Sequence, residues 1–413
     1  MSAGTDTLSA PTGDAGLEEG ASLTPAGLRL PEALLEEWMR EFYFAVDLDL
    51  GSSGVQDYSI AELRRIAGID HGEVDAMVLH DSRTLGGPGL RRALAERFLD
   101  GDPSRVIATH GSTEANFLIM QALLKPGDEV LVLEPIYQQL RAVAEAIGCR
   151  LRGWPLRSEA GFRPDVEEGA SLIGPKTRMV VVNFPHNPTG VSLSREEQRA
   201  LISAAERHGA YLVWDAAFAE LVYDGEPLPE PILEYDRAVS MGTLSKAYGL
   251  PGLRLGWCFA SPEVLQRFVR LRDYLTLHLS PLVELFAERA IRAGDQLVGL
   301  RRRQGMENLA RLERWMAEHR EHVDWTRPRG GVCCFPRLRN VPDVRDFCTR
   351  LAERERVMLV PGDCFGHPQH VRLGFGASAE DLEEGLARLS RSLRRSAAPS
   401  PAVGAESPQP DSP

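Results

Sequence analysis

Three polar side chains, an amide, a carboxylate and an amine, each stand at the end of a short apolar run. Asn187 follows MVVVNFPH, Asp215 ends YLVWD, and Lys246 follows AVSMGTLS. Such runs are typical of buried strands, and ligands of open α/β sheets lie beyond the carboxyl ends of the strands. We therefore expect these side chains to meet at one sheet edge, where the amine could form a Schiff base.

A second group of residues is suited to binding an anion. The Gly-Ser-Thr sequence at 111–113 begins a segment with helical spacing, and the first backbone N–H groups of a helix bind phosphate. In TLSKAYGLPGLRLGW, the hydroxyl residues Thr243 and Ser245 closely precede the lysine, and Arg254 follows it eight residues later. A guanidinium adds two parallel donors to such a site.

Each of these residues also has an ordinary structural explanation. Lys246 could be a solvated charge, Asp215 a helix cap, and the HNPTG segment only a turn. The GSTE segment could form a capping box with Glu114 in the first turn. The functional interpretation depends on all of them occurring together, in order, on one predicted sheet.

Alternating strand-like and helix-like segments predict the sheet that would position these residues. Apolar runs such as DEVLVLEP, TRMVVVN and AYLVWD alternate with amphipathic segments such as REEQRALISAAERHG, which ends at Gly209. Buried strands that alternate with helices indicate a mostly parallel sheet. The predicted fold class is therefore α/β, with a large domain built on this sheet.

The rest of the chain predicts two tails and a smaller domain. Residues 1–28 and 396–413 are rich in small residues or proline without apolar periodicity, and we interpret both as flexible tails. Between them we expect an N-terminal segment with one helix at 29–65, the large domain at 66–290, and a small α+β domain at 291–395.

The composition argues against several classes of function. A net charge of −12 without a long basic run disfavours nucleic acid as a partner. No apolar stretch reaches the roughly 18 residues that a membrane span requires, and the chain does not begin like a secretory signal. The six cysteines have no CxxC spacing. We predict a cytoplasmic protein with reduced cysteines and no bound metal.

One cofactor needs this whole set of groups, pyridoxal phosphate. It takes a lysine for its Schiff base, a carboxylate that holds its pyridine nitrogen protonated, donors for its phosphate and a flat group against its ring. The order of these groups, with NPTG, WDAAF and SKAYGLPGLRLG, resembles the aminotransferase class I/II family, the fold-type I pyridoxal phosphate enzymes, over about residues 30–392. The resemblance implies a seven-stranded sheet and a homodimer with its site at the interface.

The resemblance also implies roles for individual residues. Lys246 would carry the cofactor, Asp215 would pair with its pyridine nitrogen, and Asn187 would donate to its ring hydroxyl. Tyr137, in EPIYQQL, takes the stacking position, and Arg372, in HVRLGFG, takes the position that grips the substrate α-carboxylate. The implied phosphate ligands are Ser112, Thr113, Thr243, Ser245 and Arg254. Asn183 matches a polar residue near the substrate carboxylate.

The chain departs from the family pattern in three places. Phe218 stands where a tyrosine hydroxyl normally assists the ring oxygen of the cofactor. Asp81, in HDSRTLGG, stands where a tyrosine usually reaches the neighbouring subunit's phosphate, although it could be only an exposed loop aspartate. The segment 50–64, LGSSGVQDYSIAELR, corresponds to a lid over the site and includes Gly54 and Asp57.

These departures, with the segments NFPHNP and RDYLTLHLSPLVE, resemble a branch of the family that cyclises hydroxylated arginine in peptide antibiotic biosynthesis. Lys246 would remove the α-proton of 3-hydroxy-L-arginine, the β-hydroxyl would leave, and a guanidino nitrogen would close a six-membered ring. Asp81 or Asp57 would orient the guanidinium. The alternatives are a related cyclase for a dihydroxyarginine, a plain amino-acid aminotransferase, and a non-catalytic binding or regulatory module that kept the fold.

Overall fold

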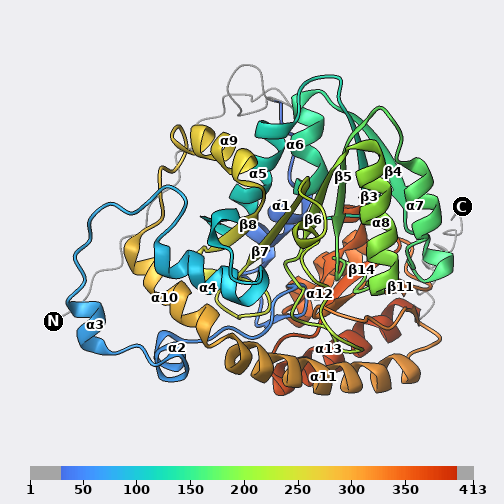
Figure 1. Cartoon of the computed structure of the whole chain (residues 1–413). Coiled ribbons are helices and arrows are strands. Elements are labelled where there is room, and N and C mark those ends of the chain that lie inside the picture. The colour runs from blue at the N-terminus through green and yellow to red at the C-terminus, as the bar shows by residue number, and fades with distance from the viewer. Residues whose placement is uncertain (1–28, 398–413) are drawn as a thin grey trace, which may run out of the picture.

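A seven-stranded sheet lies at the centre of the computed structural model, which describes residues 29–397 (Figure 1). The predicted tail at 1–28, and all but the first two residues of the tail predicted at 396–413, lie outside the described residues. In spatial order the strands are β2 (Val106–Thr109), β8 (Gly256–Phe259), β7 (Ala238–Thr243), β6 (Tyr211–Asp215), β5 (Thr177–Asn183), β3 (Glu129–Glu134) and β4 (Arg150–Pro155). Strand β8 is antiparallel to both of its neighbours, and the other strands are parallel to one another. The prediction of a mostly parallel sheet is confirmed.

Helices cover the sheet, which explains why its central strands read as continuous apolar runs. Helix α5 packs on β7 and β8, α8 on β6, and α4 on β2. The helices of this part of the chain are α4 (Pro88–Phe98), α5 (Gly111–Leu123), α6 (Gln139–Ile147), α7 (Val166–Leu172), α8 (Arg195–His208), α9 (Pro262–Arg272) and α10 (Pro281–Arg292). Single 3-10 turns lie at Pro103–Arg105, Ser158–Ala160, Pro231–Leu233, Pro251–Leu253 and, farther along the chain, Gly362–Phe365.

The helix ends follow from local sequence. Helix α8 begins at a capping box in which Ser194 accepts from the Glu197 N–H and the Glu197 carboxylate accepts from the Ser194 N–H. It ends at Gly209, whose φ of +62° is the left-handed conformation that glycine adopts without strain. The predicted stop at Gly209 is therefore confirmed.

The C-terminal part of the chain forms two small sheets, one strand of a third and three helices, gathered below the large sheet in Figure 1. Strand β14 (Val371–Gly374) pairs with β10 (Cys333–Cys334) and β13 (Val360–Pro361), and β9 (Val323–Asp324) pairs with β11 (Arg337–Leu338). The helices are α11 (Gly294–Glu318), α12 (Val344–Glu355) and α13 (Ala379–Ala397). Helix α13 continues two residues into the predicted C-terminal tail.

The N-terminal segment packs against this C-terminal part. It contains α1 (Leu34–Phe42), β1 (Leu48–Asp49), α2 (Ile60–Ala67) and α3 (His71–Asp75). Strand β1 pairs in parallel with β12 (Val357–Met358), and the Gly374 N–H at the end of β14 donates to the Leu50 carbonyl over 2.8 Å. The segment after β1 is thereby held beside β14, which brings residues from the two ends of the chain to the same place.

Two further observations concern the described residues. No helix at 29–397 is both long and apolar enough to cross a membrane. All six cysteines are free, and no cluster of His, Cys, Asp or Glu in this range could hold a metal ion.

Candidate active site

A cavity of about 550 Å³ lies at the carboxyl ends of β5, β6 and β7. Its other walls are the start of α5, the segment after β1, helix α1 and strand β14. It brings together nearly all of the predicted site residues. Those that line it are Gly54, Asp57, Ser112, Thr113, Tyr137, Asn183, Asn187, Asp215, Phe218, Thr243, Ser245, Lys246, Arg254 and Arg372.

Two strand ends are tied together at the floor of the cavity. The Asn183 amide donates to the Asp215 carbonyl over 3.0 Å, and its oxygen accepts from the Asn187 N–H at 2.7 Å. One Asp215 carboxylate oxygen accepts from the Ala217 N–H at 2.9 Å. Burial raises the pKa of Asp215 to about 6, although the Ala217 N–H and the charge of Lys246 act in the opposite direction.

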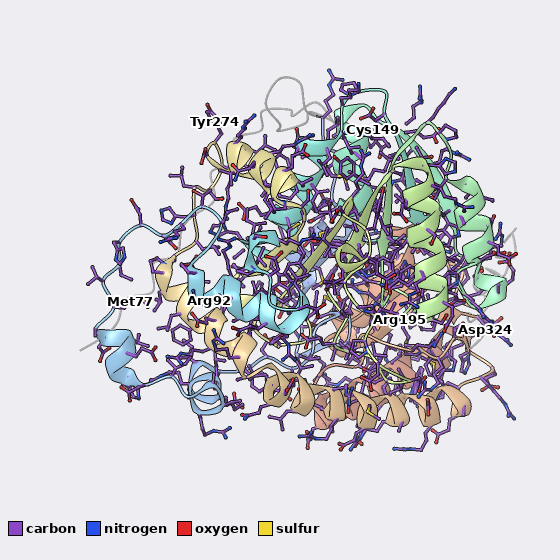
Figure 2. All side chains as sticks on the ribbon, in the orientation of Figure 1. Met77, Arg92, Cys149, Arg195, Tyr274 and Asp324 are labelled. Carbon is purple, nitrogen blue, oxygen red and sulfur yellow. The ribbon has the colours of Figure 1, made fainter. Side chains whose placement is uncertain are left out.

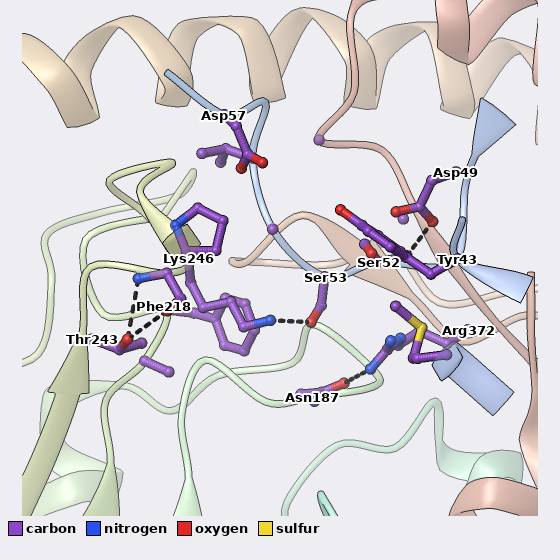
Figure 3. A pocket seen from close by; sticks show the side chains of 18 of the residues that line it. Tyr43, Asp49, Ser52, Ser53, Asp57, Asn187, Phe218, Thr243, Lys246 and Arg372 are labelled. Carbon is purple, nitrogen blue, oxygen red and sulfur yellow. Dashed lines mark hydrogen bonds between the residues drawn. The ribbon is translucent and has the colours of Figure 1, made fainter. Parts of the chain in front are cut away.

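Lys246 follows β7 and enters the centre of the cavity. Figure 3 shows it pointing toward Ser53, whose hydroxyl accepts from Nζ over 3.1 Å, with the Phe218 ring beneath. The Phe218 ring centroid is 5.9 Å from Nζ. Burial, followed by the charge of Arg372, lowers the pKa of Lys246 to about 8. A far larger share of this amine is therefore neutral near pH 7 than of an ordinary lysine.

The anion-binding residues form a cup at the start of α5. Gly111 has a φ of +73°. The N-cap residue is His110, whose side chain does not cap the helix, although Glu114 accepts from the His110 N–H at 2.6 Å. The capping box expected with Ser112 or Thr113 at the N-cap is therefore not what the structure adopts. The Ser245 hydroxyl accepts from Thr243 at 3.0 Å and from Arg254 at 3.4 Å. A Cβ on Gly256 would lie 2.6 Å from the Ser112 nitrogen, so two backbone segments meet at the cup.

Arg372 reaches the cavity from β14 and is only 3% exposed. Its Nε donates to the Gly51 carbonyl over 2.9 Å, and one terminal nitrogen donates to the Asn187 side-chain oxygen over 3.3 Å. Neither partner carries a charge, and Arg372 has no acidic partner among residues 29–397. It therefore retains donors for an incoming carboxylate.

Several polar residues of the cavity were not predicted from the sequence, among them Ser53, Glu36 and Asp49. Ser53 contacts the lysine, and Glu36 of α1 accepts from the Tyr137 hydroxyl at 2.5 Å. Asp49 accepts from the N–H groups of the two residues that follow Leu50, at 2.8 and 2.9 Å. Glu36 lies in an amphipathic helix beside the exposed Glu37, and nothing in the sequence distinguishes the two.

The two predicted guanidinium contacts differ in position. Asp57 lines the cavity, where Figure 3 shows it on the far side of Lys246 from Asn187. Asp81 does not line the cavity of the single chain. Its side chain is 97% exposed, and it contacts only His278, over 3.1 Å.

The charges of the cavity fit the predicted cofactor, pyridoxal phosphate. Asp215 is a buried carboxylate with no ion pair among the described residues, so a protonated pyridine nitrogen would supply its missing counter-charge. The hydroxyls of Ser112 and Thr113 have no internal hydrogen-bond partner in the same range, and Arg254 has no acidic one. An anion at the start of α5 would satisfy all three.

Lys246 is the one lysine that lines the cavity. The chain has three lysines among its 47 basic residues, and the other two, Lys125 and Lys176, are exposed at the surface. The remaining basic residues of the cavity are Arg254 and Arg372. Only one amine is therefore available in the cavity for a Schiff base.

Comparison with known proteins agrees with this geometry. The aminotransferase class I and II family matches residues 82–389. Capreomycidine synthase of Streptomyces vinaceus is 45% identical over 366 residues, which cover 88% of this chain and 94% of the relative. The arginine–pyruvate transaminase of Pseudomonas aeruginosa is 32% identical, over 75% of this chain and 81% of its own. The crystal structure of the PLP-dependent cyclase OrfR has a TM-score of 0.86 and 47% identity, and covers 91% of this chain and all of that one.

These matches confirm the predicted fold class and the predicted cofactor. The sheet order, the lysine at the end of β7 and the anion cup at α5 occur in a chain whose relatives are enzymes that use pyridoxal phosphate. This chain is likewise an enzyme that depends on pyridoxal phosphate, and it belongs to the aminotransferase class I and II family.

Proposed function

We propose that the enzyme cyclises 3-hydroxy-L-arginine to capreomycidine, with loss of one water. One observation carries this proposal: the cavity contains Lys246, Arg372 as a binding group for an α-carboxylate, and several acidic residues at its outer side. The similarity to capreomycidine synthase, over 88% of this chain, supports it. The similarity to OrfR, a cyclase, agrees, and streptolidine formation from a dihydroxyarginine is the related alternative.

The distribution of charge favours a cationic side chain on the substrate. Besides Lys246, Arg254 and Arg372, no basic residue of the described chain lines the cavity. The acidic residues that line it, apart from Asp215, are Glu36, Asp47, Asp49, Asp57 and Asp381. A dicarboxylate acceptor such as 2-oxoglutarate would place its second carboxylate against like charges, whereas a guanidinium meets opposite ones.

The chain's own residues divide the reaction between them. Arg372 would hold the α-carboxylate and so orient the α-hydrogen toward Lys246. The Lys246 amine, positioned by Ser53, would remove that hydrogen as a general base. When bound, pyridoxal phosphate withdraws the electrons left at the α-carbon, and Asp215 would sustain this by keeping its pyridine nitrogen protonated. Tyr137 would lie against the ring.

Ring closure needs three further proton movements. The β-hydroxyl leaves as water, and the ammonium of Lys246 is placed to supply its proton. A guanidino nitrogen then bonds to the β-carbon and releases a proton, and the α-carbon regains one. The sum is substrate minus one water, without an oxidant, a reductant or an amine acceptor.

The proposal is tested by mass spectrometry of the reaction with synthetic 3-hydroxy-L-arginine in D₂O. We expect a product one water lighter than the substrate, with one deuterium at the α-carbon because the proton returns there from solvent. L-Arginine is the matched control. It should exchange its α-hydrogen without forming a lighter product, because it has no β-hydroxyl to lose.

Three outcomes would contradict the cyclase. Rapid formation of glutamate from arginine and 2-oxoglutarate would identify an aminotransferase. An open-chain 2-oxo acid with release of ammonia would show that water leaves but the ring does not close. A chain that leaves the α-hydrogen of every arginine derivative unexchanged would support the non-catalytic alternative.

The rate at which Lys246 captures the cofactor should depend on pH. In cofactor-free enzyme we expect this rate to rise with pH, to reach half its maximum near pH 8 and to level off above it, because only the neutral amine attacks the aldehyde and burial lowers its pKa to about 8. Stopped-flow absorbance after addition of pyridoxal phosphate measures it. Arg372→Met should move the plateau to higher pH, since the Arg372 charge also lowers this pKa. A wild-type midpoint near the ordinary lysine value of 10.5 would contradict the assignment.

A homodimer belongs to the same proposal. Two loops, one that contains Asp81 and one that contains His278, both expose apolar side chains. Hydrogen bonds join the loops, one between Asp81 and His278 and one from the Ser82 N–H to His278. Figure 2 shows Tyr274 projecting from the edge of the molecule beyond α9. The exposed apolar residues are Val78, Leu79, Tyr274, Leu275 and Leu277. A second copy would cover them and bring Asp81 near a neighbouring site. A mass of one chain, measured by light scattering, would contradict the homodimer. The cytoplasmic location also stays a prediction.

A further inference from the structure

Glu36 presents a carboxylate to the cavity from helix α1. Glu36 is half-buried and lines the cavity together with Tyr137. The Tyr137 hydroxyl donates to Oε1 over 2.5 Å, and Oε2 has no hydrogen bond to the described residues. One carboxylate oxygen is thus fixed in place while the other is free to accept from a ligand.

Helix α1 is held firmly enough to make Glu36 part of a preformed wall. The Gln138 side chain accepts from the Leu34 N–H at 3.0 Å and donates to the Glu32 carbonyl at 2.6 Å. On the other side of the helix, the Trp38 indole donates to the Leu359 carbonyl at 2.8 Å. These bonds join α1 to the turn that carries Tyr137 and to the strands of the C-terminal part.

The other outer carboxylates already have partners or lie in solvent. Asp47 pairs with Arg356 and Arg388, and Asp49 accepts from two backbone N–H groups. Asp381 and Asp57 are exposed. Only Asp49 resembles Glu36, since both are half-buried and have neutral partners in the described chain. Two backbone N–H groups stabilise the charge of Asp49, whereas a single hydroxyl contacts Glu36. Its negative charge is therefore left uncompensated inside the cavity.

We infer that Glu36 receives the cationic side chain of the substrate. This inference rests on the proposed function, because a guanidinium is the substrate group that it explains. A guanidinium has five N–H donors in a planar fork, which suits a carboxylate with one oxygen free and the other held by a hydroxyl. Glu36 is thus a specificity-determining residue in addition to Asp57, the predicted contact that lies at the rim.

The electrostatic environment agrees with this placement. The charge of Glu36 acts to raise the pKa of both Tyr137 and Lys246, whereas Arg372 acts to lower both. Glu36 and Arg372 therefore face the same small space with opposite charges. An amino acid with an α-carboxylate at one end and a guanidinium at the other matches that arrangement.

The test compares L-arginine with L-citrulline, its uncharged ureido isostere, on the holoenzyme. Dissociation constants come from the change in absorbance of the bound cofactor, so no turnover is required. Wild type should bind arginine more tightly than citrulline. Glu36→Gln should lower the affinity for arginine by about 10- to 100-fold, the range for a hydrogen bond to a charged group, and change that for citrulline much less. Glu36→Asp should restore part of the preference.

Glu37→Gln is the matched control, since Glu37 is the next residue of α1 and its carboxylate points to solvent, 3.7 Å from Arg40. It should leave both dissociation constants unchanged. Equal losses for arginine and citrulline in Glu36→Gln would overturn the inference and show that Glu36 only positions Tyr137. An unchanged arginine affinity would overturn it as well. A wild type without preference for arginine would instead overturn the proposed function.

Discussion

Replacing Lys246 by alanine is expected to lower the turnover of 3-hydroxy-L-arginine by at least about 10³-fold, because the base that removes the α-hydrogen is lost. The same change removes the one amine of the cavity, so the cofactor can no longer attach covalently. Borohydride reduction of wild type followed by peptide mapping should label Lys246, and the same treatment of Lys246→Ala should label no lysine. Product formation is measured in parallel by mass spectrometry.

The other two lysines provide matched controls for this experiment. Lys125→Ala and Lys176→Ala should keep both the label on Lys246 and the wild-type rate, since both residues are exposed and distant from the cavity. A label on either of them in wild type would contradict the site. Turnover by Lys246→Ala within tenfold of wild type would show that another group removes the α-hydrogen.

Asp215→Asn is expected to have the second largest effect. Turnover should fall by about 10²- to 10⁴-fold, as is usual when one partner of a buried, hydrogen-bonded charge pair is lost. The asparagine oxygen can still accept from the Ala217 N–H, so the loss would report the charge rather than the turn. Steady-state kinetics and the absorbance spectrum of the bound cofactor measure the effect.

Although Asp215→Asn lowers turnover, it should raise the stability of the enzyme without cofactor. Burial raises the pKa of Asp215 from 3.8 to about 6, so the unfolded state loses its proton first and stability falls as pH rises through this interval. Above pH 6 the free-energy cost of burying the charged carboxylate is fully present in wild type and absent in Asp215→Asn. We expect cofactor-free Asp215→Asn to melt a few degrees higher than wild type at pH 8 and no higher at pH 3. The control is Asp236→Asn, which should leave turnover unchanged and melting nearly so, because the ion pair of Asp236 with Arg105 lies at the surface and contributes little. A lower melting temperature for Asp215→Asn at pH 8 would contradict the account.

The sequence predicted the floor of the cavity well because short-range patterns determine it. Asp215 and Lys246 follow apolar runs, and parallel strands bring their carboxyl ends to one edge of a sheet. The cup at 111–113 was recognisable for a similar reason, since it is the start of a helix that directly follows β2. In each case, a residue's place relative to its own strand or helix was sufficient.

The walls of the cavity could not be predicted in this way. Ser53 contacts Lys246 across 193 residues of sequence, and Glu36 contacts Tyr137 across 101. These contacts depend on how the N-terminal segment packs against strands from the end of the chain, which no local periodicity records. Asp81 was selected only because its position matches a site residue of the family pattern, and it does not line the cavity of the single chain.

The scarcity of lysine has a consequence for the durability of the enzyme. Pyridoxal phosphate is a reactive aldehyde, and free aldehyde damages proteins by condensing with surface amines. A basic surface supplied almost wholly by arginine offers it few such targets, because guanidinium groups remain protonated and are poor nucleophiles at neutral pH. With two exposed lysines in the whole chain, the enzyme can meet an excess of its own cofactor with little chemical self-modification.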